Sequence, residues 1–306
     1  MTRALVIGAG SIGTRHAAIL TELGHDVAVV SRRAEPGGPV YARIDAALRD
    51  HRPDYVVLAT ETGHHLAGVS ELLDLGFAGD LLVEKPLAVP SEVLRSAPLH
   101  SFGVAFNLRF HPVIVALRDV LAGRPVLTVE AYAGQHLSGW RPGRSTANQY
   151  SATREHGGGV LRDLSHELDY LTALFGACQG VFARGGRLGD VTVDSDDAWG
   201  IVTEFERAPV VTVQLNYLDR RTRRRLVINT GEQTIEADLV ANTLTIDGDV
   251  ETFSGDRSDS YRAMHRAMLD DRAAVTTLEE AVATDELIAM IETSAATRAW
   301  VAPEGI

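Results

Sequence analysis

The sequence contains a single lysine, Lys85, whereas its 28 other basic side chains are all arginine. Arginine stays protonated at any working pH, while a lysine ammonium is compact and its pKa can be tuned. A lone lysine therefore indicates a position where arginine cannot serve. Lys85 ends an apolar run and precedes Pro86, which fixes the direction in which the chain leaves. It is a candidate for electrostatic stabilisation of a reacting oxygen; a surface lysine at a strand end is the alternative.

A glycine-rich turn near the N-terminus has the spacing of a dinucleotide-binding loop. It reads Gly8-Ala9-Gly10-Ser11-Ile12-Gly13, and it follows an apolar run and opens a helical stretch. Glycines at these positions let the backbone approach a pyrophosphate, and the helix N-terminus supplies amides. We therefore expect the cofactor to be bound by Gly8, Gly10, Ser11, Ile12 and Gly13.

The end of the second apolar run bears on which nicotinamide cofactor is bound. An acidic residue there would bind the ribose 2′-hydroxyl of NAD, but the run ends Ser31-Arg32-Arg33 and the first acid is Glu35. Arginine binds phosphate through two parallel hydrogen bonds. The sequence therefore predicts NADP(H), contacted by Ser31, Arg32 and Arg33, with NAD(H) as the alternative.

Composition excludes several classes of function. A net charge of −12 argues against a nucleic-acid partner. No apolar run is long enough for a membrane span, and the first residues do not have the pattern of a signal peptide, so we expect a cytoplasmic enzyme. The single cysteine, Cys178, permits no internal disulfide, and no histidine pair has the spacing of a metal site, so no metal is expected.

Apolar runs and helical stretches alternate over the first 110 residues. Strands are expected near residues 5–8, 27–31, 55–60, 81–84 and 102–106, with helices near 12–23, 43–50, 65–75 and 91–96. Apolar strands joined by helices are typical of a parallel sheet covered on both faces, which binds ligands at the carboxyl ends of its strands. We predict an α/β, doubly wound Rossmann domain over residues 1–110.

The pattern of expected helices and strands changes in residues 111–306. Helices are expected near 112–122, 160–175, 259–270 and 278–299, with a strand at 126–133 and successive strands over 179–254. Strands joined by short turns indicate a large, open, mostly antiparallel sheet, hence an α+β substrate-binding domain. Its C-terminal helix could pack back on the first domain. An open sheet face also favours a homodimer or homotetramer formed through that sheet.

The expected helix at 160–175 has two distinct faces. Leucines at 161, 164, 168 and 171 recur at spacings of three and four residues and form one apolar stripe. At about 100° per residue, Asp163, His166 and Tyr170 cluster on the opposite face and could act on one ligand. A solvated polar face is the alternative. His16, on the first helix, is interpreted as a packing or capping residue.

Four motifs together resemble the Gfo/Idh/MocA family, the group of glucose–fructose oxidoreductase and inositol dehydrogenase. They are Leu58-Ala59-Thr60 with His65 five residues on, Glu84-Lys85-Pro86, Asn107-Leu108-Arg109-Phe110-His111-Pro112, and the stretch from Gly157 through Asp163 and His166 to Tyr170. The resemblance covers essentially the whole chain. One departure is that Asp163 and His166 are one residue closer than the usual Asp-x-x-x-His.

The resemblance implies roles for these residues. Lys85 would sit beside the nicotinamide and bind the reacting substrate oxygen, and Glu84 would help to hold the cofactor. Asp163 and His166 would form the acid–base pair. Thr60 and His65 would line the nicotinamide side of the site, and weaker candidates for substrate contact are Asn107, Arg109, Tyr150 and Tyr170.

These observations predict reversible hydride transfer between NADP(H) and a hydroxyl or carbonyl carbon of a sugar, amino sugar, nucleotide sugar or cyclitol. His166 would accept the hydroxyl proton, Lys85 would stabilise the alkoxide, and Asp163 would orient His166. One alternative is an NAD-dependent cyclitol or sugar dehydrogenase. The alternative of another class is a sugar sensor that binds cofactor without turnover, although such relatives usually lose the lysine or histidine.

Overall fold

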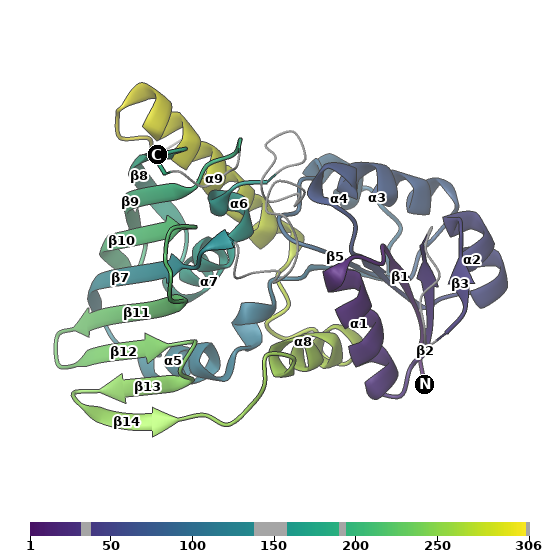
Figure 1. The fold of residues 1–306 in the computed structure, drawn as a ribbon, viewed down its shortest axis with the longest axis horizontal. Helices are drawn as coiled ribbons and strands as arrows, with labels where there is room; N and C mark the ends of the chain where they lie inside the picture. Colours follow the sequence, from purple (N-terminus) through teal and green to yellow (C-terminus); the bar gives the residue numbers. More distant parts are fainter. Residues whose placement is uncertain (32–37, 138–157, 190–193, 304–306) are drawn as a thin grey trace. The chain divides into compact units, whose positions relative to one another are not determined.

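The computed structural model describes residues 1–31, 38–137, 158–189 and 194–303 (Figure 1). The chain forms two compact units. The first comprises Met1–Phe110 and Asp256–Val282, and the second comprises His111–Gly255 and Ala283–Ile306. The first unit thus combines residues 1–110 with a segment from near the C-terminus.

The first unit is a doubly wound α/β fold. Within the described residues its strands lie in the order β3-β2-β1-β4-β5-β6, and every pair is parallel. The strands are β1 (Arg3–Ile7), β2 (Asp26–Val30), β3 (Val40–Tyr41), β4 (Tyr55–Leu58), β5 (Asp80–Val83) and β6 (Ser101–Val104). The helices are α1 (Ser11–Glu22), α2 (Ile44–His51), α3 (His65–Asp74), α4 (Ser91–Arg95) and α8 (Asp259–Leu269), with short 3₁₀ turns η1 (Thr62–His64) and η2 (Asn107–Phe110).

Both faces of this sheet are covered, so successive residues of a strand pack into two separate hydrophobic cores. Leu5 packs with residues of α2 and α3, whereas Ala4 packs with residues of α1 and α8. Helices α1 and α8 lie side by side on one face (Figure 1), although some 240 residues of chain separate them. The covered parallel sheet confirms the predicted Rossmann architecture, whose ligand-binding edge is formed by the carboxyl ends of the strands.

The second unit is built on a large mixed sheet. Its strands are β7 (Val126–Gly134), β8 (Cys178–Gly186), β9 (Ala198–Phe205), β10 (Ala208–Asn216), β11 (Arg223–Thr230), β12 (Thr234–Asp238), β13 (Thr243–Ile246) and β14 (Asp249–Thr252). Among the described residues the order is β14-β13-β12-β11-β7-β10-β9-β8. Strands β7 and β10 are parallel and the other neighbours are antiparallel, as the sequence predicts for most of the sheet.

Helices cover one face of the mixed sheet. They are α5 (Pro112–Leu121), α6 (Val160–Asp163), α7 (His166–Phe175) and the part of α9 (Leu278–Thr297) that follows Val282. Helix α5 packs on β12 and β13, and α6 packs on β9 and β10. Along β9, buried residues alternate with exposed ones, so the other face presents side chains such as Val202 and, on β10, Val210, which are 45% and 49% exposed.

The predicted single helix at 160–175 is wrong, because helical hydrogen bonding is interrupted at Leu164–Ser165 and the segment forms α6 and α7. Asp163 is the last residue of α6 and His166 is the first of α7. The projection at 100° per residue therefore does not hold across the break. In the part of the chain that the structure describes, no helix combines the length and the apolar character needed to cross a bilayer.

Candidate active site

The glycine turn between β1 and α1 has the shape of a pyrophosphate cradle. Gly8 has a φ of +102°, and a Cβ there would stand 2.6 Å from the carbonyl oxygen of Ala59. A Cβ at Gly13 would overlap the carbonyl oxygen of Gly8, so this glycine lets α1 pack against β1. A Cβ at Gly10, by contrast, would meet no described atom within 4 Å. Backbone atoms therefore crowd the loop at Gly8 and Gly13, whereas the space beside Gly10 is open. Ser11 and Ile12 begin the helix next to this open space.

Thr60 adds a second indication of a ligand beside this loop. Its Oγ1 is buried and has no hydrogen-bond partner within the described ranges. Its backbone nitrogen is 3.2 Å from the position of a Cβ on Gly8, so it adjoins the turn. A buried hydroxyl without a partner costs about 1–3 kcal/mol, and such groups call for an explanation. The open space at Gly10 and the unpartnered hydroxyl together fit a bound dinucleotide.

Glu84 and Lys85 follow β5 at the same edge of the sheet. Glu84 is 7% exposed, and its Oε2 accepts a hydrogen bond of 3.1 Å from the backbone N–H of Lys85. Its Oε1 lies 2.9 Å from Nε2 of His16, a residue of α1. Burial raises the pKa of Glu84, but the hydrogen bond from His16, the charge of Lys85 and the Lys85 amide outweigh it and leave the pKa below its usual value. Glu84 is therefore an ionised carboxylate directly beside the lysine.

His65 contacts the backbone of the segment that follows Lys85. Its side chain is fully buried, with Nδ1 at 3.1 Å from the carbonyl oxygen of Pro86 and 3.2 Å from that of Leu87. Its Nε2 lies 3.3 Å from the carbonyl oxygen of Thr60. Burial lowers the pKa of His65 despite these carbonyl contacts. The ring thus ties the segment after β4 to the segment after Lys85, whereas the sequence had placed it on the lining of the site.

Asn107 and Arg109 have partners inside the first unit. The Asn107 amide donates to Ser260 Oγ at 2.8 Å, and Arg109 Nη1 lies 2.8 Å from Glu280 Oε1. Both side chains are buried, at 4% and 7% exposure. They join η2 to the C-terminal segment that returns to this unit, so these contacts give no support to the expected role in substrate binding.

Asp163 is held by a buried tyrosine in the second unit. It is 5% exposed, and its Oδ2 accepts a hydrogen bond of 2.5 Å from the hydroxyl of Tyr217. His166 is half-buried at the start of α7, three residues on. Tyr170, expected beside them, is fully buried and donates to Glu167 at 3.4 Å. It belongs to the interior of this unit, because the interruption between α6 and α7 alters the predicted polar face.

The glycine that precedes α6 has a steric reason. Gly159 has a φ of +124°, and a Cβ there would overlap the carboxylate of Asp196. That carboxylate accepts hydrogen bonds from the backbone N–H of Leu161 at 2.9 Å and from Trp199 Nε1 at 2.7 Å. Asp196 thereby fixes the start of α6 and, through it, the position of Asp163.

Three of the residues that the sequence singled out, Arg32, Arg33 and Tyr150, lie outside the described residues. Ser31, which ends the same run as the two arginines, is half-buried, and its amide donates to the carbonyl oxygen of Tyr41 at 2.9 Å. No group of three or more potential metal ligands occurs in the described ranges.

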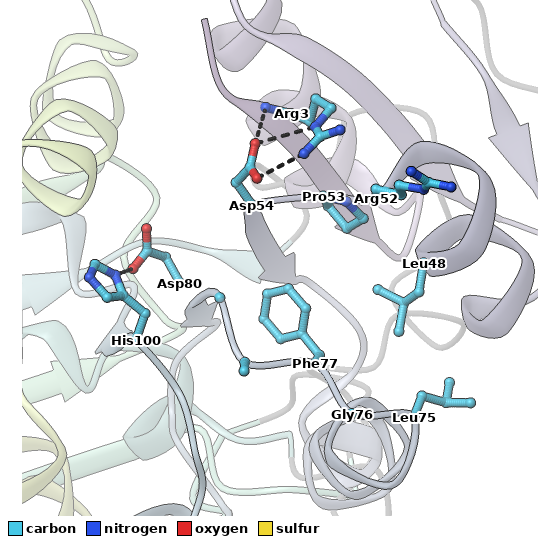
Figure 2. A pocket seen from close by; sticks show the side chains of 12 residues that line it. Arg3, Leu48, Arg52, Pro53, Asp54, Leu75, Gly76, Phe77, Asp80 and His100 are labelled. Atoms are coloured by element: carbon cyan, nitrogen blue, oxygen red, sulfur yellow. Dashed lines mark hydrogen bonds and ion pairs between the residues drawn. The ribbon is translucent and has the colours of Figure 1, made fainter.

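A concavity of about 580 Å³ lies at the other edge of the Rossmann sheet. Figure 2 shows its lining, where Arg3 is bonded to Asp54 and His100 to Asp80, at the amino ends of β1, β4 and β5. Parallel sheets bind their ligands at the carboxyl ends, where Gly8, Thr60 and Lys85 stand. The concavity is therefore separate from the candidate active site.

Sequence comparisons cover most of the chain. Residues 2–97 match the model of an oxidoreductase family with an NAD-binding Rossmann fold, and residues 114–236 match the GFO/IDH/MocA C-terminal domain. A search of curated proteins found no match.

Solved structures share the fold over nearly the full length. GenD2 from gentamicin A biosynthesis, in complex with NAD, is 22% identical with a TM-score of 0.81, covering 99% of this chain and 96% of its own. UDP-N-acetylglucosamine 3-dehydrogenase GnnA from Acidithiobacillus ferrooxidans is 23% identical with a TM-score of 0.77, covering 96% and 97%. The WlbA dehydrogenase from Bordetella pertussis, in complex with NADH and UDP-GlcNAcA, is 17% identical with a TM-score of 0.80, covering 99% and 98%.

Proposed function

Because this chain belongs to the Gfo/Idh/MocA family of oxidoreductases, we propose that it transfers a hydride between a nicotinamide cofactor and a carbon bearing a hydroxyl or carbonyl group on a sugar-like substrate. The observation that carries the proposal is the cofactor cradle. Gly10 opens to free space and the buried Thr60 hydroxyl beside Gly8 has no partner in the described chain.

The names of similar structures support the proposed substrate class. The names of similar structures include a UDP-N-acetylglucosamine 3-dehydrogenase, a dehydrogenase with bound UDP-GlcNAcA and a levoglucosan dehydrogenase. We propose a sugar, amino sugar, nucleotide sugar or cyclitol as the substrate of this chain. The polyhydroxylated class is common to all of them.

The bound nicotinamide supplies the hydride acceptor or donor. In the direction of oxidation, the Lys85 ammonium stabilises the negative charge that develops on the substrate oxygen. His166 accepts the proton of the reacting hydroxyl, and Asp163, held by Tyr217, orients His166. The ionised Glu84 attracts the charge of the neighbouring Lys85, and its Oε2 accepts the backbone N–H of Lys85.

The direct test is turnover with a panel of keto-sugars and NADPH or NADH. Lys85→Ala should lower kcat by about 100-fold to 1000-fold, the usual effect of removing one donor to a developing oxyanion. His166→Ala should lower it by about 100-fold or more. His100→Ala, at the opposite edge of the Rossmann sheet, is the matched control and should leave kcat within about threefold. Turnover that survives both active-site changes within a few-fold contradicts the proposal, and cofactor binding without any turnover favours the sensor.

For the cofactor, we propose a preference for NADP(H), supported by Ser31-Arg32-Arg33 and by the lack of an acid before Glu35. Similar structures hold NAD or NADH, and another is described as a putative NADPH-dependent oxidoreductase, so both cofactors occur among these relatives. Arg32→Ala should weaken NADPH binding by about 10-fold to 100-fold and leave NADH binding within about threefold. Arg43→Ala, which removes an exposed side chain paired with Asp45, is the control. Equal effects on both cofactors would refute the proposed contact between Arg32 and the 2′-phosphate.

We propose further that two or four copies of the chain associate through the uncovered face of the mixed sheet, where Val202 and Val210 are exposed. Light scattering should give a mass of two or four chains, and Val210→Glu should shift it toward one. A monomer at micromolar concentration would refute this assignment.

A further inference from the structure

Four polar side chains form an unbroken chain of contacts in the interior of the first unit. His16 Nε2 is 2.9 Å from Glu84 Oε1, and His16 Nδ1 is 2.8 Å from His265 Nε2. His265 Nδ1 is in turn 2.9 Å from the hydroxyl of Tyr55. The four residues come from α1, the segment after β5, α8 and β4, so four separate elements of the first unit meet here. Tyr55, His16 and His265 have no solvent exposure.

The hydrogen in each of these three contacts can be assigned by starting from Glu84. An ionised Glu84 can only accept, so His16 Nε2 carries a hydrogen. If His265 Nε2 donates to His16 Nδ1, then His265 Nδ1 is an acceptor and receives the Tyr55 hydroxyl hydrogen. Each contact then holds one hydrogen, both imidazoles are neutral, and the only charge is on Glu84. The reverse assignment at the middle contact makes His16 a buried cation and turns the Tyr55 hydroxyl into an acceptor.

Burial favours the assignment that places the fewest charges in the interior, since a cationic His16 ring would have no contact with solvent. Burial also lowers the pKa of the His265 ring well below its usual value. It also raises the pKa of Tyr55 well above the usual value, and Asp80 adds to that rise. Both shifts keep the proton on the tyrosine and off the second histidine. The chain therefore runs from Tyr55 through His265 and His16 to Glu84.

We propose that Tyr55, His265 and His16 are positioning residues that orient the Glu84 carboxylate and through it hold Lys85 in place for catalysis. The inference rests on the proposed function, in which Lys85 is the group that binds the reacting oxygen. None of the three contacts substrate in this account; they act through Glu84, whose second oxygen accepts the backbone N–H of Lys85.

Two other polar side chains, Tyr261 and Arg15, lie near this network but do not replace His16 as the partner of Glu84 Oε1. The Tyr261 hydroxyl, on α8, has its pKa raised to about 12 by burial and by Glu84, so it also keeps its proton. The Arg15 guanidinium lies over the Tyr261 ring at 5.4 Å and belongs to the same face of the unit. His16 packs edge-on against Tyr261 at 5.5 Å and against His265 at 5.0 Å, so both rings are fixed in orientation. The hydrogen bond to Glu84 Oε1 comes from His16.

A role in packing alone does not account for the arrangement. Apolar side chains of similar volume fill interiors at least as stably as buried polar groups do, since desolvation opposes the latter. The neighbouring core residues of α1 and α8, Leu20, Met264 and Met268, are apolar. Among these apolar residues, the polar side chains of Tyr55, His265 and His16 follow one another in a line that ends on Glu84. That line ends at the residue next to the lone lysine, which is the expected place for an orienting network.

The first test separates tautomers from activity. Full-length protein labelled with ¹⁵N-histidine should show His16 and His265 as neutral rings protonated at Nε2 at pH 7, assigned from the His16→Gln and His265→Gln spectra. The His265 ring should not gain a proton between pH 8 and pH 6. A ring protonated at Nδ1 or on both nitrogens overturns the direction of the chain. Because this measurement needs no substrate, it stands even if the proposed reaction is wrong.

The second test is kinetic. His16→Leu removes the donor to Glu84 and should lower kcat by about 10-fold to 100-fold, the usual penalty for a misplaced catalytic group, with a much smaller change in KM. His16→Gln keeps an N–H near the Nε2 position and should recover kcat to within about threefold of wild type. NADPH binding, followed by its fluorescence, shows that each variant is folded.

The matched control is His51→Leu. His51 is also a buried histidine of the first unit, 8% exposed, and its Nε2 lies 3.1 Å from the carbonyl oxygen of Ala4, away from Lys85. It should lower the melting temperature and leave kcat within about threefold. If His16→Leu and His51→Leu reduce kcat alike, or if glutamine at position 16 gives no recovery, the positioning role is refuted. If wild type itself turns over no substrate while the tautomers are as assigned, the proposed function fails and the network stands.

Discussion

Replacing Thr60 with valine should raise the stability of the cofactor-free protein and lower its affinity for the cofactor. The Thr60 hydroxyl is buried and has no hydrogen-bond partner in the described structure, beside a glycine turn that is open at Gly10. Valine has the same branching at Cβ, so it fills the same volume without the unpaired oxygen. The two effects have opposite signs, and this separates a ligand-binding group from an ordinary buried threonine.

The magnitude follows from the cost of an unpaired buried hydroxyl, about 1–3 kcal/mol. Thr60→Val should therefore raise the unfolding free energy of the cofactor-free protein by about 1–2 kcal/mol, or its melting temperature by roughly 3 °C per kcal/mol. Loss of one hydrogen bond to the bound dinucleotide should weaken NADPH binding by about 0.5–1.5 kcal/mol, which is roughly 2-fold to 12-fold.

The assay is thermal unfolding without and with saturating NADPH, together with a fluorescence titration of NADPH. Thr203→Val is the control, because Thr203 is 2% exposed and its hydroxyl donates to the carbonyl oxygen of Gly180 at 2.8 Å. It should destabilise the cofactor-free protein and leave NADPH affinity unchanged. A lower melting temperature for cofactor-free Thr60→Val, or unchanged NADPH affinity, would refute the reasoning.

Three further predictions use other features of the two units. Gly10→Ala should leave the melting temperature within about 1 °C while weakening NADPH binding, whereas Gly13→Ala should lower the melting temperature, because its Cβ overlaps the Gly8 carbonyl oxygen. Tyr217→Phe removes the hydrogen bond to Asp163 and should lower kcat about 10-fold with little change in KM, measured at saturating cofactor. The folded-state pKa of His265 lies well below its usual value of 6.5, so this histidine resists protonation only when folded, and its contribution to stability is complete above pH 6.5 and falls as the pH drops below it. Denaturant titrations of His265→Gln should show a shallower loss of stability from pH 6.5 to 5, by up to about 1.36 kcal/mol per pH unit.

The Rossmann unit could be predicted from sequence because each of its signals is local. Apolar runs such as Tyr55–Leu58, which is buried throughout, alternate with amphipathic helices, and the glycine spacing from Gly8 to Gly13 stands in the first turn. The structure explains that spacing sterically, since two of the three glycines are forced by neighbouring backbone atoms.

The predictions that differ from the structure share a physical cause, because they depend on contacts that sequence periodicity does not reveal. The leucine spacing runs unbroken through Leu164, so the pattern gave no sign that α6 ends at Asp163. Nothing near Arg109 in the chain indicates that its partner is Glu280, 171 residues away.

The interpretation of His16 as a packing or capping residue missed its hydrogen bonds to Glu84 and to His265, which lies 249 positions on. One local signal existed. His16 falls three residues after Gly13 and four before Leu20, on the buried stripe of α1, and a histidine on such a stripe needs polar partners. The partners themselves could come only from the fold.

The central claim is that this chain moves a hydride between a nicotinamide and a sugar-like carbon, with Lys85 on the reacting oxygen. The most direct measurement is mass spectrometry of products formed from keto-sugars with NADPH carrying deuterium at the transferable C4 position. The account predicts one deuterium on the carbinol carbon of the product with the wild-type protein, and at least about 100-fold slower labelling with Lys85→Ala. Reduced product without deuterium, or equal labelling rates for the two proteins, would contradict it.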